Sequence, residues 1–210
     1  MSPLKADQAV DRRDAIRSEA ARLFAASGVG DASLSQIAEA VGIRKASLYH
    51  FFPSKQDLVM EVLRPVLEEP YQELQQIATS GADLMDRFRE GAAALGDLFE
   101  KQPERMEILV RGRLERHLSA EHMDEIRSWK AAYTNLWREL IAEGVRTGVF
   151  RRSDEMISAF ALIGALNWMY AWFRPSDPIA GSEVARQIVD HFLRGLLVAP
   201  DPGGNDDEWH

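Results

Sequence analysis

The sequence predicts an all-α protein of about nine helices, in one large domain or two small ones. Apolar residues recur at intervals of three and four along nearly all of the 210 residues, and no stretch alternates convincingly with a period of two. Hydrophobic residues make up 46% and charged residues 28%, which is the balance of a globular protein with a real core. Cysteine is absent, and this excludes a disulfide scaffold and thiolate metal sites.

The N-terminal part of the chain divides into helices with clear end signals. Residues 16–24 carry an apolar stripe, and Gly28 is a natural stop for that helix. The stripe over residues 34–41 is shorter and ends at Gly42. A third short helix follows and must end before Pro53, because proline breaks a helix.

A further helix is expected to start at Ser54. Asp57 follows three residues later, and this pair resembles a capping box with Asp in place of the usual Glu or Gln. Pro65 and Pro70 interrupt the next stretch, so we expect a kink or a restart there.

The C-terminal half continues the helical pattern. Apolar stripes over residues 123–145 and 184–196 predict two more helices. Between them, residues 156–173 form an uncharged run of 18 residues, which reaches the lower range of a membrane span. Polar residues lie within the run and no second comparable run exists, so a helix buried in a core or an interface is the favoured interpretation. Residues 199–210, rich in Pro, Gly and acid, are expected to form a disordered tail.

The net charge of −8 is distributed unevenly. Residues 1–64 carry nine Lys and Arg against eight Asp and Glu, whereas the remainder carries 16 against 25. An acidic protein is poorly suited to coating DNA without specificity. The nearly neutral N-terminal part can still hold a DNA-binding module, because binding depends on the local field.

Residues 33–58 are the most informative stretch. One short helix ends at Gly42, a tight turn follows, and the next short helix carries basic and hydroxyl side chains. This is the pattern of a helix-turn-helix, in which the second helix enters the major groove. Arg and Lys can read guanine edges, while hydroxyl and imidazole groups can hold phosphates. A plain helical hairpin with solvated charges would fit the spacing almost as well.

Residues 10–64 resemble the DNA-binding domain of TetR-family transcriptional regulators. The pattern of the family is met at Gly28, Ser33, Ile37, Ala38, Gly42, Leu48, Tyr49, Phe51, Ser54, Lys55 and Leu58. The sequence departs from it at the usual Gly-Thr pair of the recognition helix, which is Ala46-Ser47 here. The serine keeps the hydroxyl group, so a phosphate contact remains available.

The resemblance implies a role for each exposed polar residue of the motif. Arg44, Lys45 and Ala46 would face base edges, whereas Ser47, Tyr49, His50 and Lys55 would hold phosphates. Ser33 or Ser35 would cap the first helix of the motif and touch the DNA backbone, since the N-terminal amides of a helix attract phosphate.

By the same resemblance, residues 65–198 form the ligand-binding and dimerisation domain that follows the DNA-binding domain of residues 1–64. The spacing of Asn167, Trp168, Trp172, Phe173 and Pro175 is similar to that of repressors of fatty-acid and steroid degradation, a branch that answers acyl-CoA thioesters. Such a ligand needs an apolar slot and basic groups for its phosphates. The expected ligand residues are Met106, Leu109, Arg113, Trp129, Tyr133, Trp137 and Trp168, with Arg105, Arg111 and Arg116 completing a basic group.

The last two helices would form the four-helix dimer interface of the family. The residues expected there are Leu162, Leu166, Val184, Ile188, Phe192 and Leu196. The partners implied are double-stranded DNA, a second copy of the chain and a small apolar effector, which is an acyl-CoA or another hydrophobic ligand such as an efflux substrate. No membrane partner is expected, and a cytoplasmic location is the default because the first 15 residues lack an apolar run.

An enzyme is the main rival class. Helical bundles hold di-iron sites through Glu-x-x-His, and none of the five histidines has a glutamate three residues before it. A Gly-x-Ser-x-Gly nucleophile elbow is also absent. We therefore expect no catalytic residues, no metal site and no cofactor.

Overall fold

The computed structural model describes residues 3–197, with side chains from Arg12 onward. The tail expected at residues 199–210 lies outside this part. The helices are α1 (Pro3–Ser27), α2 (Leu34–Ala40), α3 (Lys45–Phe51), α4 (Lys55–Ala78), α5 (Leu84–Lys101), α6 (Pro103–Arg111), a 3-10 turn (Leu114–Arg116), α7 (Ala120–Arg146), α8 (Glu155–Asn167), α9 (Met169–Trp172) and α10 (Gly181–Leu196). Within the described range, nine α-helices have at least seven residues and α9 is a single turn, so the predicted all-α fold is confirmed.

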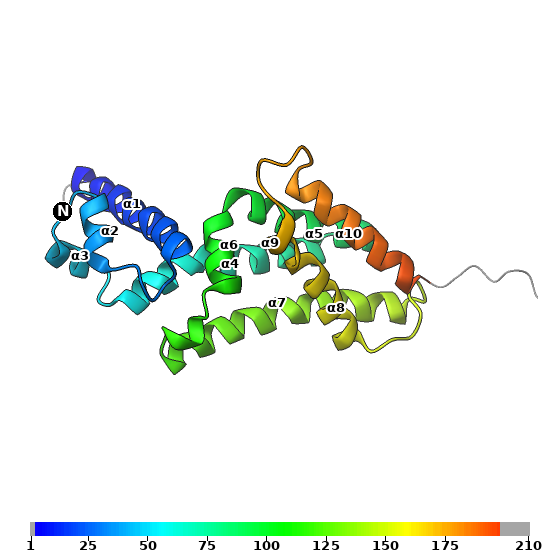
Figure 1. The fold of residues 1–210 in the computed structure, drawn as a ribbon. Helices are drawn as coiled ribbons and strands as arrows, with labels where there is room; N and C mark the ends of the chain where they lie inside the picture. The colour runs from blue at the N-terminus through cyan, green and yellow to red at the C-terminus, as the bar shows by residue number, and fades with distance from the viewer. Residues whose placement is uncertain (1–2, 198–210) are drawn as a thin grey trace, which may run out of the picture.

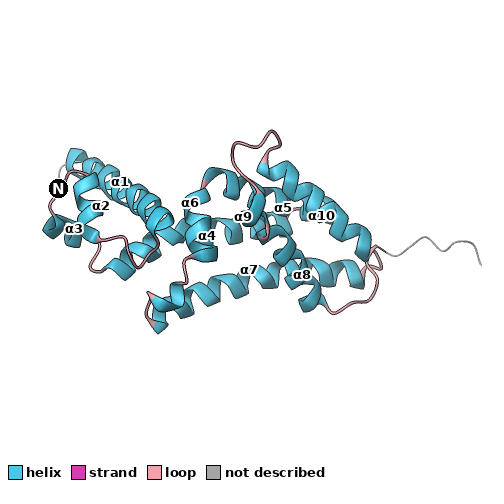
Figure 2. Cartoon of the chain, viewed as in Figure 1, coloured by secondary structure: helices cyan, strands magenta, loops and turns pink. Residues whose placement is uncertain are grey.

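The molecule is elongated. Figure 1 shows α1, α2 and α3 gathered at one end and α10 near the other, with α4 and α7 running between them. Helices and loops make up the whole of the drawn chain between residues 3 and 197 (Figure 2), apart from an isolated antiparallel bridge between Phe150 and Leu197. Within that same range, no helix combines the length and the apolar character needed to cross a membrane.

Local signals set the ends of the N-terminal helices. Gly28 and Gly42 have φ angles of 86° and 69°, a region that glycine enters without strain. Ser33 and Gln36 form a reciprocal capping box: the Ser33 hydroxyl accepts from the Gln36 N–H at 3.2 Å, and the Gln36 side chain accepts from the Ser33 N–H at 2.8 Å. These contacts hold the tight turns of the predicted helix-turn-helix.

Helix α4 connects the two ends of the molecule. The Ser54 hydroxyl accepts from the Asp57 N–H at 3.1 Å, so the helix starts where the sequence predicts. It then runs through Pro65 and Pro70 to Ala78 as one helix, and the restart predicted at these prolines is wrong. The reason is that an apolar stripe stays buried on both sides of each proline, and this packing holds the helix together. The stripe consists of Leu58, Val59, Val62, Leu63, Val66, Leu67 and Leu74. The domain boundary expected at residue 64 therefore lies inside a helix.

The C-terminal helices pack around Trp137, which is fully buried against Phe88. Helix α10 lies closest to α5, where Gly96 and Gly181 bring the two backbones together. A Cβ added at Gly96 would lie 2.1 Å from the carbonyl oxygen of Gly181, so only glycine fits. Arg87 of α5 pairs with Glu143 of α7 and donates to the Ala78 carbonyl at 3.0 Å, which ties together three helices.

Candidate nucleic-acid interface and ligand pocket

The second helix of the motif, α3, presents a polar surface to solvent. Leu48 is fully buried and anchors the helix against the core. The opposite surface exposes Arg44, Lys45, Ala46, Tyr49 and His50, with Ser47 partly exposed. Arg44 is the N-cap residue and its side chain makes no capping hydrogen bond. The side chains expected to face base edges are therefore gathered at the start of α3 and lie on the outside of the protein.

The flanks of α3 carry the side chains expected to meet the DNA backbone. Ser33 and Ser35 are exposed at the start of α2. The Lys55 amino group donates to the Gly30 carbonyl at 3.0 Å and lies 6.0 Å from the centre of the Phe24 ring. Burial lowers the pKa of Lys55. Lys55 therefore fastens α4 to the loop after α1, and any phosphate contact would have to share its ammonium with that carbonyl.

Arg13 positions the recognition helix, a role for which the sequence carries no local sign. Its guanidinium donates to the Phe51 carbonyl at 3.2 Å, lies 4.6 Å from the centre of the Phe52 ring and pairs with Glu61 at 3.2 Å. Burial acts to raise the pKa of Glu61, but Arg13 and Arg64 outweigh it, and the pKa is lowered. Arg13 thus satisfies a carbonyl at the C-terminal end of α3 and fixes that end against α1 and α4.

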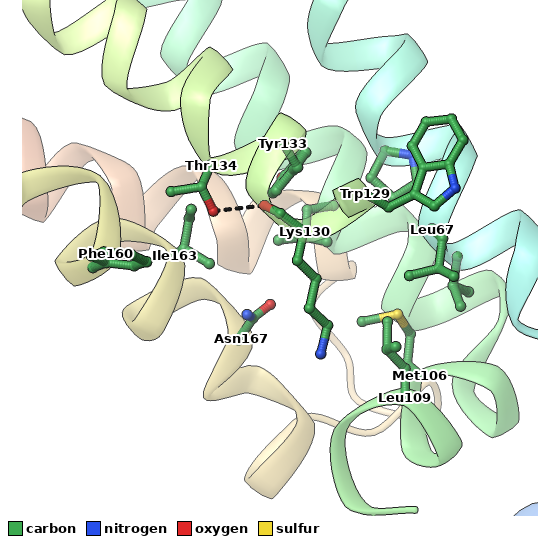
Figure 3. Close-up of a pocket in the computed structure, with 13 residues that line it drawn as sticks. Leu67, Met106, Leu109, Trp129, Lys130, Tyr133, Thr134, Phe160, Ile163 and Asn167 are labelled. Atoms are coloured by element: carbon green, nitrogen blue, oxygen red, sulfur yellow. Dashed lines mark hydrogen bonds between the residues drawn. The ribbon is translucent and has the colours of Figure 1, made fainter. Parts of the chain in front are cut away.

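A pocket lies in the other half of the chain, between α4, α5, α6, α7 and α8. Its volume is about 260 Å³. Figure 3 shows its wall, which consists of Val66, Leu67, Pro70, Leu95, Met106, Leu109, Trp129, Lys130, Tyr133, Thr134, Phe160, Ile163 and Asn167. Four of the expected ligand residues meet here, namely Met106, Leu109, Trp129 and Tyr133. Lys130 was not among the residues expected from the sequence, because a lone lysine on a helix is normally solvated.

The remaining expected ligand residues lie elsewhere. Trp137 fills the core beside Tyr133, at 6.2 Å between ring centroids, so its indole is packing and not pocket wall. Trp168 is 60% exposed and stacks edge-on with Tyr170 at the surface. Arg113 is exposed on the short turn before α7, with a φ of 46°. Helical spacing predicted that these side chains share one pocket. Spacing alone does not reveal which face of each helix is directed toward the pocket.

The expected basic group also does not converge on the pocket. Arg105 donates to the Val62 carbonyl of α4 at 3.1 Å, and Arg111 pairs with Glu107 on its own helix at 3.2 Å. Arg116 is exposed on the turn that precedes α7. Arg105 and Arg111 are thus directed to different partners, and none of the four arginines lines the pocket, so a phosphate role for the exposed Arg113 and Arg116 stays a prediction.

The expected dimer residues divide into two sets. Leu162, Leu166 and Leu196 are buried inside the protomer, so they cannot be a free surface. Val184, Ile188 and Phe192 of α10 are partly buried. The large apolar side chains that are exposed in this region are Ile157, Phe160, Trp168, Trp172, Ile179 and Leu197. Helix α8 is apolar on all sides, and for that reason the sequence could not indicate which of its faces is outward.

The start of α7 contacts the DNA-binding end of the molecule. The Ser119 N–H donates to the Gln56 side chain at 2.9 Å, and the His122 Nε2 lies 3.6 Å from an Asp57 carboxylate oxygen. The His117 ring packs against Gly30, where an added Cβ would lie 2.9 Å from its Cε1. The same α7 carries the pocket residues further along its length, so the two sites share a helix.

A helix-turn-helix at one end and an apolar pocket at the other, joined by α4 and α7, define a DNA-binding regulator. Residues 16–62 match the family model of bacterial regulatory proteins of the tetR family, and residues 81–196 match that of the tetracyclin repressor-like C-terminal domain. The chain belongs to the TetR family. Membership makes it a transcriptional regulator and not an enzyme.

Three similar proteins illustrate the range of the resemblance. The HTH-type transcriptional repressor KstR2 of Mycolicibacterium smegmatis is 26% identical over 197 residues, which cover 93% of this chain and 96% of that protein. The TetR-family regulator PfmR of Thermus thermophilus is 31% identical with a TM-score of 0.79, over 85% of this chain and 97% of the other. AibR, solved in complex with isovaleryl coenzyme A and operator DNA, is 25% identical with a TM-score of 0.73. The match covers 89% of this chain and 98% of AibR.

Proposed function

We propose that the protein is a homodimeric repressor that binds a partly palindromic operator and leaves it when an apolar ligand fills the pocket of Figure 3. The observation that carries this proposal is the continuity of α4, which starts beside the recognition helix and lines the pocket with Val66, Leu67 and Pro70. Such a regulator acts on DNA in the cytoplasm. The similarity to the repressor KstR2 supports repression over activation.

Dimerisation would occur through α8 and α10. Ile157, Phe160 and Trp168 form an exposed apolar surface on α8 and just after it, which a second copy would remove from water. The dimer would place two copies of α3 in successive major grooves, about 34–36 Å apart. A ligand that binds better to a dimer with another spacing would then weaken DNA binding by that difference in affinity.

The effector class that we favour is an acyl compound, with an acyl-CoA as the leading candidate. A structure of the related AibR contains isovaleryl coenzyme A. The pocket of about 260 Å³ matches a small apolar group and not an entire CoA, whose nucleotide would have to remain outside. A lipophilic cation, as many efflux substrates are, is disfavoured because the Lys130 ammonium would repel it.

Selection from random DNA duplexes with the purified full chain tests the proposal. We expect recovery of one partly palindromic sequence, bound by a dimer in sedimentation, and lower DNA affinity when an acyl-CoA is added. Recovery of no preferred duplex, or a chain that is monomeric at micromolar concentration, would overturn it.

A further inference from the structure

Lys130 is the one charged side chain among the described residues of the pocket wall. Figure 3 shows it extending across the pocket, with Asn167 on one side of its amino group and Met106 and Leu109 on the other. Within residues 12–197, the amino group has neither an ion pair nor a hydrogen-bond partner. The Lys130 side chain is exposed to solvent through the open pocket, and partial desolvation by the surrounding pocket wall lowers the pKa of Lys130.

The neighbouring polar groups leave this ammonium without a partner. The Thr134 hydroxyl donates to the Lys130 carbonyl at 2.8 Å within α7, and it accepts no hydrogen bond from the Lys130 amino group. The Tyr133 hydroxyl is fully buried, also without a hydrogen-bond partner in the part of the chain that is described. The Asn167 amide points into the pocket near the amino group and likewise makes no hydrogen bond with another described side chain. One side of an otherwise apolar cavity therefore presents the Lys130 amino group and the Asn167 amide, neither of which has a hydrogen-bond partner among the described side chains.

Such an arrangement favours a particular kind of ligand. An ammonium that has lost part of its water is stabilised by an anionic or strongly polar oxygen, and a charge-assisted hydrogen bond is about twice as strong as a neutral one. The apolar wall opposite favours hydrocarbon, which gains about 0.8 kcal/mol per buried methylene. A ligand that satisfies both sides has a hydrocarbon body and an oxygen acceptor at one end.

We propose that Lys130, with Asn167 beside it, binds the acyl oxygen of the effector, so that the pocket recognises a carboxylate or a thioester carbonyl attached to a small hydrocarbon body. This inference rests on the proposed ligand-responsive function and names the group that the pocket selects. The shared chemistry is the acyl group, and the source is either a free acid or its CoA thioester.

Binding of matched eight-carbon compounds to the full-length protein without DNA tests the inference. The probes are octanoate, octanoyl-CoA, 1-octanol and octylamine, followed by calorimetry and by tryptophan fluorescence, since Trp129 lines the pocket. We expect octanoate or octanoyl-CoA to bind at least about tenfold more tightly than octanol, and octylamine to bind most weakly. Whichever of the two acyl probes binds more tightly identifies the source.

Substitution then assigns the preference to one side chain. In Lys130→Met the ratio of acyl to alcohol affinity should fall to near one, whereas Lys130→Arg should keep most of it. Both variants should fold, because the amino group makes no contact that they remove, and thermal unfolding checks this. Lys101→Met is the matched control, since Lys101 is exposed on α5 and pairs with Asp97.

The inference is overturned if octanol binds wild type as tightly as the acyl probes, if Lys130→Met keeps the preference, or if none of the probes binds. These results are separate from the proposed function, because DNA selection and sedimentation are measured without ligand. A protein that selects an operator but ignores all acyl probes would retain the first proposal and lose this one.

Discussion

The side chain of Gln56 accepts a hydrogen bond from the backbone N–H of Ser119 at 2.9 Å, across 63 positions of the chain. Gln56 lies in the first turn of α4, next to the recognition helix, and Ser119 is the N-cap residue of α7. Because α7 also carries the pocket residues Trp129 and Lys130, this bond joins the two sites directly. It gives the ligand a second route to the DNA-binding end besides α4.

Removal of this bond should therefore weaken the communication between the sites. In Gln56→Ala the affinities for DNA alone and for an acyl ligand alone should stay close to wild type. The loss of DNA affinity on adding saturating ligand should shrink by a factor of about two to ten, because one such hydrogen bond contributes about 0.5–1.5 kcal/mol. Fluorescence anisotropy of labelled operator, with and without ligand, measures this loss of DNA affinity. Gln76→Ala, on the same helix, is the control and should leave the factor unchanged.

Arg44 is expected to read a base. Arg44→Ala should cost about 1–3 kcal/mol at the preferred operator and broaden the selected sequence at one position of each half-site. The fold should be intact, because the Arg44 side chain makes no capping bond. Tyr49→Phe should instead weaken all duplexes alike, as a lost phosphate contact does. Equal losses on specific and random DNA for Arg44→Ala would contradict the assignment, and Arg152→Ala, exposed far from α3, is the control.

The dimer can be tested at a position that the protomer does not need. Trp168 is 60% exposed, so Trp168→Glu should leave the subunit folded and shift sedimentation towards the monomer. Leu162→Glu should unfold the protein instead, because Leu162 is fully buried within the subunit. Val110→Glu, which places the same charge at an exposed apolar position of α6, should keep the dimer. A dimeric Trp168→Glu protein would show that the interface lies elsewhere.

The Arg87–Glu143 pair makes stability depend on pH. The hydrogen bonds from Arg87 lower the pKa of Glu143, so the folded state binds its proton less readily than the unfolded state does. The contribution is fully present above the unfolded pKa and is lost as the pH falls through the lowered folded value. Because Glu143 is partly exposed, Glu143→Gln should cost only about 1–2 kcal/mol at neutral pH.

Urea unfolding of wild type and Glu143→Gln over a series of pH values checks this prediction. The difference between their free energies of unfolding should shrink as the medium becomes more acidic. Asp124→Asn, which breaks an exposed pair with Arg127, is the matched control and should show almost no difference at any pH. If the difference in free energy of unfolding between wild type and Glu143→Gln stays constant down to the acid transition, the role of the ion pair is refuted.

The features predicted well from the sequence were those set by neighbouring residues. Gly28 and Gly42 ended helices, Ser33 and Ser54 capped them, and each of these signals acts within one turn. Helix periodicity then placed the apolar stripes, and the resemblance of residues 10–64 to the family pattern decided between a helix-turn-helix and a plain helical hairpin.

The predictions that were wrong concern features that depend on residues distant in the sequence. Proline is unfavourable inside an isolated helix, but the packing of α4 against other helices outweighs the lost hydrogen bonds of Pro65 and Pro70. The outward face of α8 is decided by its neighbours α7 and α10, since apolar residues lie on every side of the helix. The hydrogen bond from Arg13 to the Phe51 carbonyl spans 38 positions of the chain, so no local sequence pattern predicts it.

The close crossing of α5 and α10 has a consequence for how this chain tolerates variation. At Gly96 and Gly181 the obstacle to a Cβ is the facing backbone, at 2.1 and 2.3 Å, so no second substitution in a nearby side chain can make room. At Gly28 and Gly42 the space is open and only the backbone angle matters, which asparagine tolerates at modest cost. In a saturation library, Gly96 and Gly181 should therefore be glycines that accept no replacement, and they would keep α10 tied to α5 in any variant that survives.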